Sequence, residues 1–107
     1  MEPLLRERLG LSESEIECFC AKWQVVSLYL FGSILSERFT DQSDVDVLVS
    51  FAPEAPWTML DLVRMRDELQ GLLGRKVDLI ERVALEHSRN PIRREAILRS
   101  ARRVYAA

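Results

Sequence analysis

Two short apolar runs, residues 25–31 and 45–49, constrain the fold of this chain more than any other feature. Both runs have the length and the β-branched composition of strands, and a polar connection separates them. The second run opens with Ser-Asp-Val-Asp, residues 43–46. Because side chains two residues apart on a strand point to the same face, Asp44 and Asp46 should project together. Two adjacent carboxylates repel each other, so a cation between them would stabilise the fold.

A third carboxylate, Asp78, interrupts the apolar run 77–80. An unpaired charge on a mostly apolar strand is costly, so Asp78 needs either a partner or a site. The partner could be Lys76 or an arginine. If this strand lies beside the second one, Asp78 instead shares a face with the other two aspartates. Three converging carboxylates would suit hard divalent ions that prefer oxygen ligands, Mg²⁺ above all.

The remaining elements predict one α+β domain, residues 1–107, with a small mixed β-sheet covered by helices. Capping signals predict helices that begin at Ser12 and Thr58, and Gly74 should end the second helix. The strand that follows, 76–80, should run parallel to the second strand, whereas the first two strands should pair antiparallel. Asn90-Pro91 should start a final helix. Its expected buried stripe contains Ile92, Ala96, Ile97, Ala101, Val104 and Tyr105.

The formal net charge of −2 gives the chain no overall attraction to nucleic acid, although the charge is unevenly distributed. Residues 82–107 contain seven Arg against two Glu. Arginine binds phosphate and carboxylate in a forked geometry, so this bias suits a polyanion or an acidic protein surface. A solvated helix face is the simpler interpretation, and nucleic acid stays open as a less favoured partner.

No apolar run is long enough to span a bilayer, and the N-terminus is charged where a signal peptide needs an apolar core. We therefore expect a cytoplasmic protein without a membrane partner. Cys18 and Cys20 point to different sides of a helix, which predicts plain thiols with Cys20 in the core. Trp57 could stack on a base, but packing at a helix entrance is the favoured interpretation.

The first strand closes with Gly32-Ser33, and a nine-residue spacer separates this pair from the second strand. This pattern, Gly-Ser followed by Ser-Asp-Val-Asp-Val-Leu-Val at 43–49, resembles the signature of the DNA polymerase β-like nucleotidyltransferase superfamily. The short chain resembles the minimal nucleotidyltransferase group, some of whose members are antitoxins of HEPN-domain toxins. The resemblance implies a fold like the polymerase β palm.

The resemblance also implies roles for individual residues. Asp44, Asp46 and Asp78 would be the catalytic residues and the ligands of two Mg²⁺ ions. Gly32 and Ser33 would bind the triphosphate of the nucleotide, and the short connection after Gly32 should begin as a helical turn with Ser33 near its N-cap. Either Arg38 or Arg75 could add positive charge there.

The function implied by the resemblance is transfer of NMP, most readily AMP from ATP, to a hydroxyl of a macromolecule. A tyrosine of a HEPN toxin would be the acceptor, and this chain would be the antitoxin. The alternative is a non-catalytic nucleotide-binding module that neutralises a partner protein by contact. The chain is short for a drug-modifying transferase with its own acceptor domain. The sequence leaves the oligomeric state open, homo-oligomers included.

Overall fold

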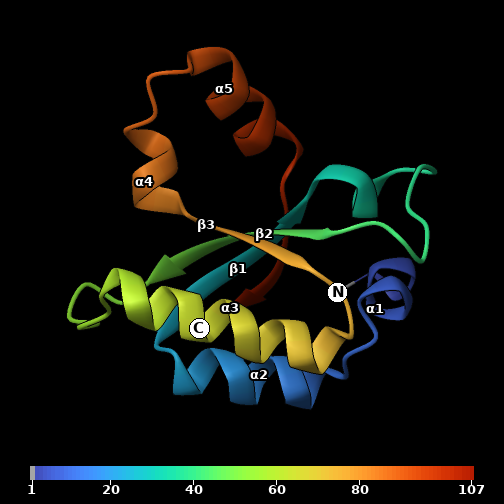
Figure 1. Cartoon of the computed structure of the whole chain (residues 1–107), viewed down its shortest axis with the longest axis horizontal. Helices are drawn as coiled ribbons and strands as arrows, with labels where there is room; N and C mark the ends of the chain where they lie inside the picture. Colours follow the sequence, from blue (N-terminus) through green and yellow to red (C-terminus); the bar gives the residue numbers. More distant parts are fainter. Residues whose placement is uncertain (1) are drawn as a thin grey trace.

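The computed structural model describes residues 2–107 and contains a four-stranded sheet in the order β3-β2-β1-β4 (Figure 1). The strands are β1 (Val25–Phe31), β2 (Val45–Phe51), β3 (Val77–Glu81) and β4 (Arg102–Ala106). β1 runs antiparallel to β2 and to β4, and β2 runs parallel to β3. The predicted mixed sheet and the predicted directions of the first three strands are therefore confirmed.

Helices lie on both faces of this sheet. α2 (Glu13–Lys22) and α3 (Met59–Leu73) cover one face, and α1 (Pro3–Leu9) lies at the edge of the same layer. The short helices α4 (Arg82–Glu86) and α5 (Pro91–Ser100) stand over the other face. Capping boxes at Ser12 and Thr58 begin α2 and α3, as predicted, and Gly74 ends α3 in the left-handed conformation. Within residues 2–107, every helix is too short or too polar to cross a membrane.

The two faces of β2 belong to two separate hydrophobic cores. Val45, Val47 and Val49 are at most 1% exposed and pack in the main core, against α2 and α3. Leu48, between them, points the other way into a smaller core. Phe31, Leu85 and Ile97 complete this second core beneath α4 and α5. Burial of Val45, Val47 and Val49 therefore fixes the register of β2 and, with it, the face on which Asp46 lies.

The predicted final helix is wrong at its C-terminal end. α5 ends at Ser100, and Val104 and Tyr105 lie on β4, which pairs with β1. Ile92, expected in the buried stripe, is 82% exposed. The edge of β1 would otherwise present unpaired backbone groups, and pairing with β4 satisfies them. Tertiary pairing with β1 thus overrides the helical period of the last residues, Val104 and Tyr105.

Candidate functional site

Asp46 and Asp78 lie directly opposite each other on neighbouring strands. Their Cα atoms are partners in the parallel β2–β3 ladder. Val77 and Leu79 pack in the main core, whereas Ile80 packs in the smaller one, so Asp78 faces the α4–α5 side of the sheet. Asp46 faces the same side, because Leu48 does. The predicted common face of the two carboxylates is confirmed.

Asp44 precedes β2 and completes a group of three carboxylates whose charges act on one another. Burial raises the pKa of Asp46, and the charges of Asp78 and Asp44 raise it further, while the guanidinium of Arg93 lowers it. Within residues 2–107, none of the three carboxylates has an ion pair. The part of the chain described here therefore leaves a negative charge on this face that a cation would neutralise.

The three carboxylates do not converge on a point. Within residues 2–107, no group of three or more His, Cys, Asp or Glu side chains is close enough to hold one metal ion. Asp44 and Asp78 are exposed, so their side chains are free to rotate. The donor set, carboxylate oxygens only, fits Mg²⁺.

Gly32 adjoins the carboxylate of Asp46. Phe31, the residue before it, is the partner of Asp46 in the β1–β2 ladder. A Cβ atom built on residue 32 would lie 2.1 Å from Oδ2 of Asp46, and the φ angle of +77° favours glycine in any case. The backbone of residue 32 therefore comes as close to the carboxylate group as atoms allow, which requires a residue without a side chain.

The turn after Gly32 is the short 3₁₀ helix η1 (Gly32–Leu35), in agreement with the prediction. Ser33 is half-buried and lies in the first turn, two residues after the N-cap residue Phe31 and therefore near the N-cap, as expected. Ile34 is fully buried and fixes η1 to the main core.

The side chain of Arg8, on α1, makes hydrogen bonds to η1 and to the residue that follows it. Its Nη1 donates hydrogen bonds of 2.7 Å to the carbonyl oxygens of Ile34 and Ser36. No local sequence pattern indicates this role, because the partners are 26 and 28 residues away along the chain. Arg8 therefore positions the turn that follows Gly32.

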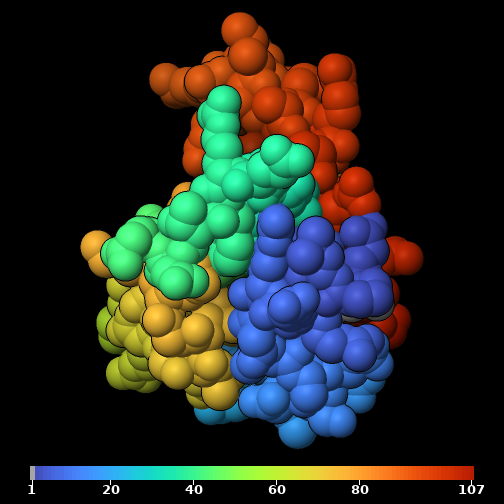
Figure 2. Space-filling model, turned by 90° about the vertical axis from the view of Figure 1, so that its right-hand side faces the viewer, coloured from blue at the N-terminus to red at the C-terminus, as the bar shows by residue number. Residues whose placement is uncertain are grey.

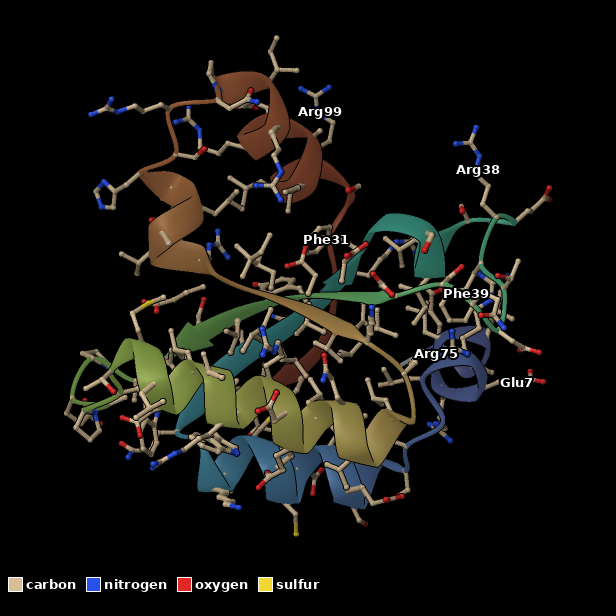
Figure 3. All side chains as sticks on the ribbon, in the orientation of Figure 1. Glu7, Phe31, Arg38, Phe39, Arg75 and Arg99 are labelled. Atoms are coloured by element: carbon tan, nitrogen blue, oxygen red, sulfur yellow. The ribbon has the colours of Figure 1, made fainter. Side chains whose placement is uncertain are left out.

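Arg75, one of the two candidates for phosphate binding, is engaged with the loop before Asp44. Its guanidinium lies over the Phe39 ring, 4.4 Å from the ring centre, and donates to the carbonyls of Thr40 and Ser43. Figure 3 shows Arg75 and Phe39 next to each other. The other candidate, Arg38, is exposed and points away from the sheet (Figure 3). Among the arginines, Arg93 is the one whose charge acts on Asp46.

The tryptophans and the cysteines lie outside this site. Trp57 packs against Trp23 with ring centres 5.0 Å apart, and its Nε1 donates to the Trp23 carbonyl, which supports the packing interpretation. Both cysteines are free thiols; Cys20 is fully buried and Cys18 is exposed, as predicted. Burial raises the pKa of the Cys20 thiol to about 12.

Comparison with known proteins assigns the chain to a family. Residues 14–104 match the family model described as a nucleotidyltransferase domain. A candidate protein adenylyltransferase of Methanocaldococcus jannaschii is 35% identical over 66 residues. That match covers 62% of this chain and 65% of the relative, so the alignment spans just under two thirds of the relative's length.

Two solved structures share the fold. The structure of a candidate minimal nucleotidyltransferase superimposes with a TM-score of 0.66 at 34% identity, covering 92% of this chain and 90% of the other. A complex of a tri-AMPylated HEPN toxin with an MNT antitoxin, from Shewanella oneidensis, gives 0.63 at 17% identity, covering 96% and 73%. The second likeness shows the fold alone. The family model matches most of the length of the chain, and the carboxylates and Gly32 lie together as described above. The chain therefore belongs to the nucleotidyltransferase domain family.

Proposed function

We propose that this chain is a Mg²⁺-dependent nucleotidyltransferase that moves AMP from ATP to a hydroxyl of another protein. The observation that carries the proposal is the direct opposition of Asp46 and Asp78 on one sheet face, beside Gly32. Carboxylates beside a glycine, where a phosphate can come close to the backbone, suit nucleotidyl transfer, because its active site must hold two metal ions and a triphosphate. Membership of the nucleotidyltransferase domain family supports the same reaction class.

Each residue of the site has a role in this reaction. Asp44 and Asp46 would hold two Mg²⁺ ions, and Asp78 would be the third ligand. When bound, Mg²⁺ supplies positive charge that neutralises the phosphates and the leaving group. Gly32 leaves space for a phosphate near the backbone, and the hydroxyl and N–H of Ser33 would donate to a phosphate oxygen.

The proposed transfer is a single displacement at the α-phosphorus of ATP. The acceptor oxygen forms a bond to that phosphorus, and the bond from the phosphorus to the oxygen that bridges to the β-phosphate breaks. Pyrophosphate leaves with the electron pair of this bond. Asp78 is placed to take the proton that the acceptor hydroxyl loses.

In this proposal, the acceptor is a tyrosine of a HEPN-domain toxin, and the chain acts as its antitoxin. Two names support this choice: the Methanocaldococcus jannaschii relative is named as a candidate protein adenylyltransferase, and the Shewanella oneidensis complex holds a tri-AMPylated HEPN toxin beside its MNT antitoxin.

The proposal is tested with ATP labelled at either the α- or the γ-phosphate, Mg²⁺, and a purified HEPN-domain toxin as the acceptor. Label from the α-position should appear on the toxin, and label from the γ-position should not. The double variant Asp44→Asn, Asp46→Asn should transfer none. If it transfers none yet still neutralises the toxin in cells, neutralisation is by contact, and the antitoxin activity does not depend on catalysis.

A further inference from the structure

A hollow of about 340 Å³ lies beside Asp78, between β3, α4 and α5. Its walls combine apolar side chains with a carboxylate, a hydroxyl and a guanidinium. They are formed by Asp78, Ile80, Ala84, Leu85, Ser88 and Arg93. The hollow therefore has the composition of a site for a side chain that is apolar along its length and polar at its end.

The order of the strands places this hollow on one side of Asp46 and Gly32 on the other. Gly32 follows β1, Asp46 lies on the central strand β2, and Asp78 lies on β3. In an in-line displacement the attacking and leaving oxygens lie on opposite sides of the phosphorus. If the triphosphate lies against Gly32, the attacking oxygen comes from the β3 side, where the hollow is.

The lobe that carries the hollow, residues 82–100, is rich in unpaired arginine. Arg82 pairs with Glu86 and also donates to the Tyr29 hydroxyl, and Arg94 donates to the Ser88 carbonyl. Within residues 2–107, the guanidinium groups of the remaining three have no such partner; these are Arg89, Arg93 and Arg99. Figure 2 shows the lobe in orange, standing above the rest of the molecule. A macromolecule can therefore reach it, and its charge favours an acidic one.

We infer that this hollow is the acceptor site: it receives a tyrosine side chain from an acidic protein segment, with Arg93 pairing with a carboxylate of that segment. The inference rests on the proposed function and adds the location and the charge of the acceptor. Ile80 and Leu85 would flank the ring, and the hydroxyl at its end would reach Asp78.

Binding of short fluorescent peptides tests the inference separately from catalysis. The probes are Glu-Glu-Tyr-Glu-Glu and Lys-Lys-Tyr-Lys-Lys, followed by anisotropy in the presence of Mg²⁺ and the non-hydrolysable analogue AMP-PNP. The acidic peptide should bind at least about tenfold more tightly than the basic one, as expected for complementary charges at low salt. Equal binding of the two peptides, or no binding of the acidic one, overturns the inference.

Two variants locate the binding. Ala84→Phe fills the hollow and should weaken the acidic peptide about tenfold or more, through steric exclusion. Val83→Phe is the matched control, because Val83 is on the same helix, 56% exposed, and outside this hollow. Arg93→Gln should weaken the acidic peptide about fivefold and should not weaken the basic peptide, so the ratio of the two affinities should fall. An Ala84→Phe variant that binds the acidic peptide as the parent does would place the acceptor elsewhere.

The affinity of each variant for AMP-PNP, measured by calorimetry, separates an effect on the acceptor site from an effect on nucleotide binding. It should stay within about twofold of the parent for Ala84→Phe, because residue 84 lies on α4, away from Gly32. If the peptides bind as expected but AMP never reaches a HEPN partner, the proposed function fails and the binding site stands. If transfer to the partner is normal in Ala84→Phe, the acceptor site fails and the proposed function stands.

Discussion

Oδ2 of Asp46 lies 2.1 Å from the position that a Cβ atom at residue 32 would take. Gly32, the residue that follows β1, and the carboxylate on β2 therefore fill adjoining space, so a side chain added at residue 32 would displace Asp46. This contact couples the turn that would hold phosphate to the carboxylate that would hold metal. The coupling explains why glycine is needed at residue 32 for sterics as well as for its backbone angle.

Gly32→Ala should therefore lose both stability and activity. The added Cβ displaces the Asp46 carboxylate, and the φ angle of +77° is unfavourable for alanine. We expect a loss of about 1–3 kcal/mol in the free energy of unfolding and no measurable AMP transfer. Denaturant unfolding and the labelled-ATP assay measure the two effects.

Substitutions at two other glycines separate the effect of the φ angle from the effect of the contact with Asp46. Gly74 also has a positive φ, +70°, but a Cβ there meets nothing within 4 Å, so Gly74→Ala should lose stability while keeping activity. Gly71 lies inside α3 with open space around it, and Gly71→Ala should stabilise the chain by about 0.5–1 kcal/mol. Full activity in Gly32→Ala would show that the Gly32–Asp46 contact has no role in the reaction.

Asp46→Asn should stabilise the metal-free protein at neutral pH. Burial, Asp78 and Asp44 together raise the pKa of Asp46, so its ionised form costs stability. A raised pKa in the folded state means that the protein loses stability as pH rises through that value. The gain from asparagine should be present at pH 7, below about 1 kcal/mol because solvent screens the charges, and should vanish below the ordinary aspartate pKa of 3.8.

Thermal unfolding in EDTA at pH 3 and pH 7 measures this effect. Addition of Mg²⁺ should raise the melting temperature of the parent more than that of the variant, because the variant lacks one carboxylate. A variant that is less stable than the parent at pH 7 in EDTA would mean that the three carboxylates do not repel one another in the folded chain.

Arg8→Ala should weaken nucleotide binding, although Arg8 is proposed to position η1 and not to contact the nucleotide. The substitution removes the side-chain donor from the carbonyls of Ile34 and Ser36, of which the latter keeps the Phe39 N–H, and this should cost about 1–3 kcal/mol in stability. The less well-held η1 should raise the dissociation constant for AMP-PNP. Arg6→Ala is the control, because Arg6 is exposed and its guanidinium pairs with Glu13 at the surface, and we expect a change below about 1 kcal/mol. Unchanged AMP-PNP affinity in Arg8→Ala would contradict a positioning role for Arg8.

The two cysteines should differ sharply in reactivity. Cys18 is exposed, whereas Cys20 is fully buried with its pKa raised to about 12. A thiol reagent such as DTNB should modify one thiol per native chain quickly and both thiols in denaturant, because the thiolate is the reactive form. Rapid modification of both in the native protein would show that α2 opens readily.

The sequence predicted the features that depend on local patterns. Alternation along β2 was sufficient to place Val45 and Val47 in the core and Asp46 on the other face, and the Thr58 cap was sufficient to start α3. β4 could not be predicted, because its residues continue a helical period and only the free edge of β1 makes them a strand. Arg8 and Arg93 were missed for a related reason: Arg8 acts on backbone far away in the chain, and Arg93 reaches the Asp46 site only once α5 has folded over the sheet.

A crystal structure with Mn²⁺ and AMP-PNP, with anomalous scattering to locate the metal, tests the central claim most directly. The account predicts two Mn²⁺ ions about 3.5–4 Å apart, held by Asp44, Asp46 and Asp78, with phosphate oxygens against the backbone of Gly32 and Ser33. Mn²⁺ absent from these carboxylates while nucleotide is bound, or Asp78 left outside the coordination of either ion, would contradict it.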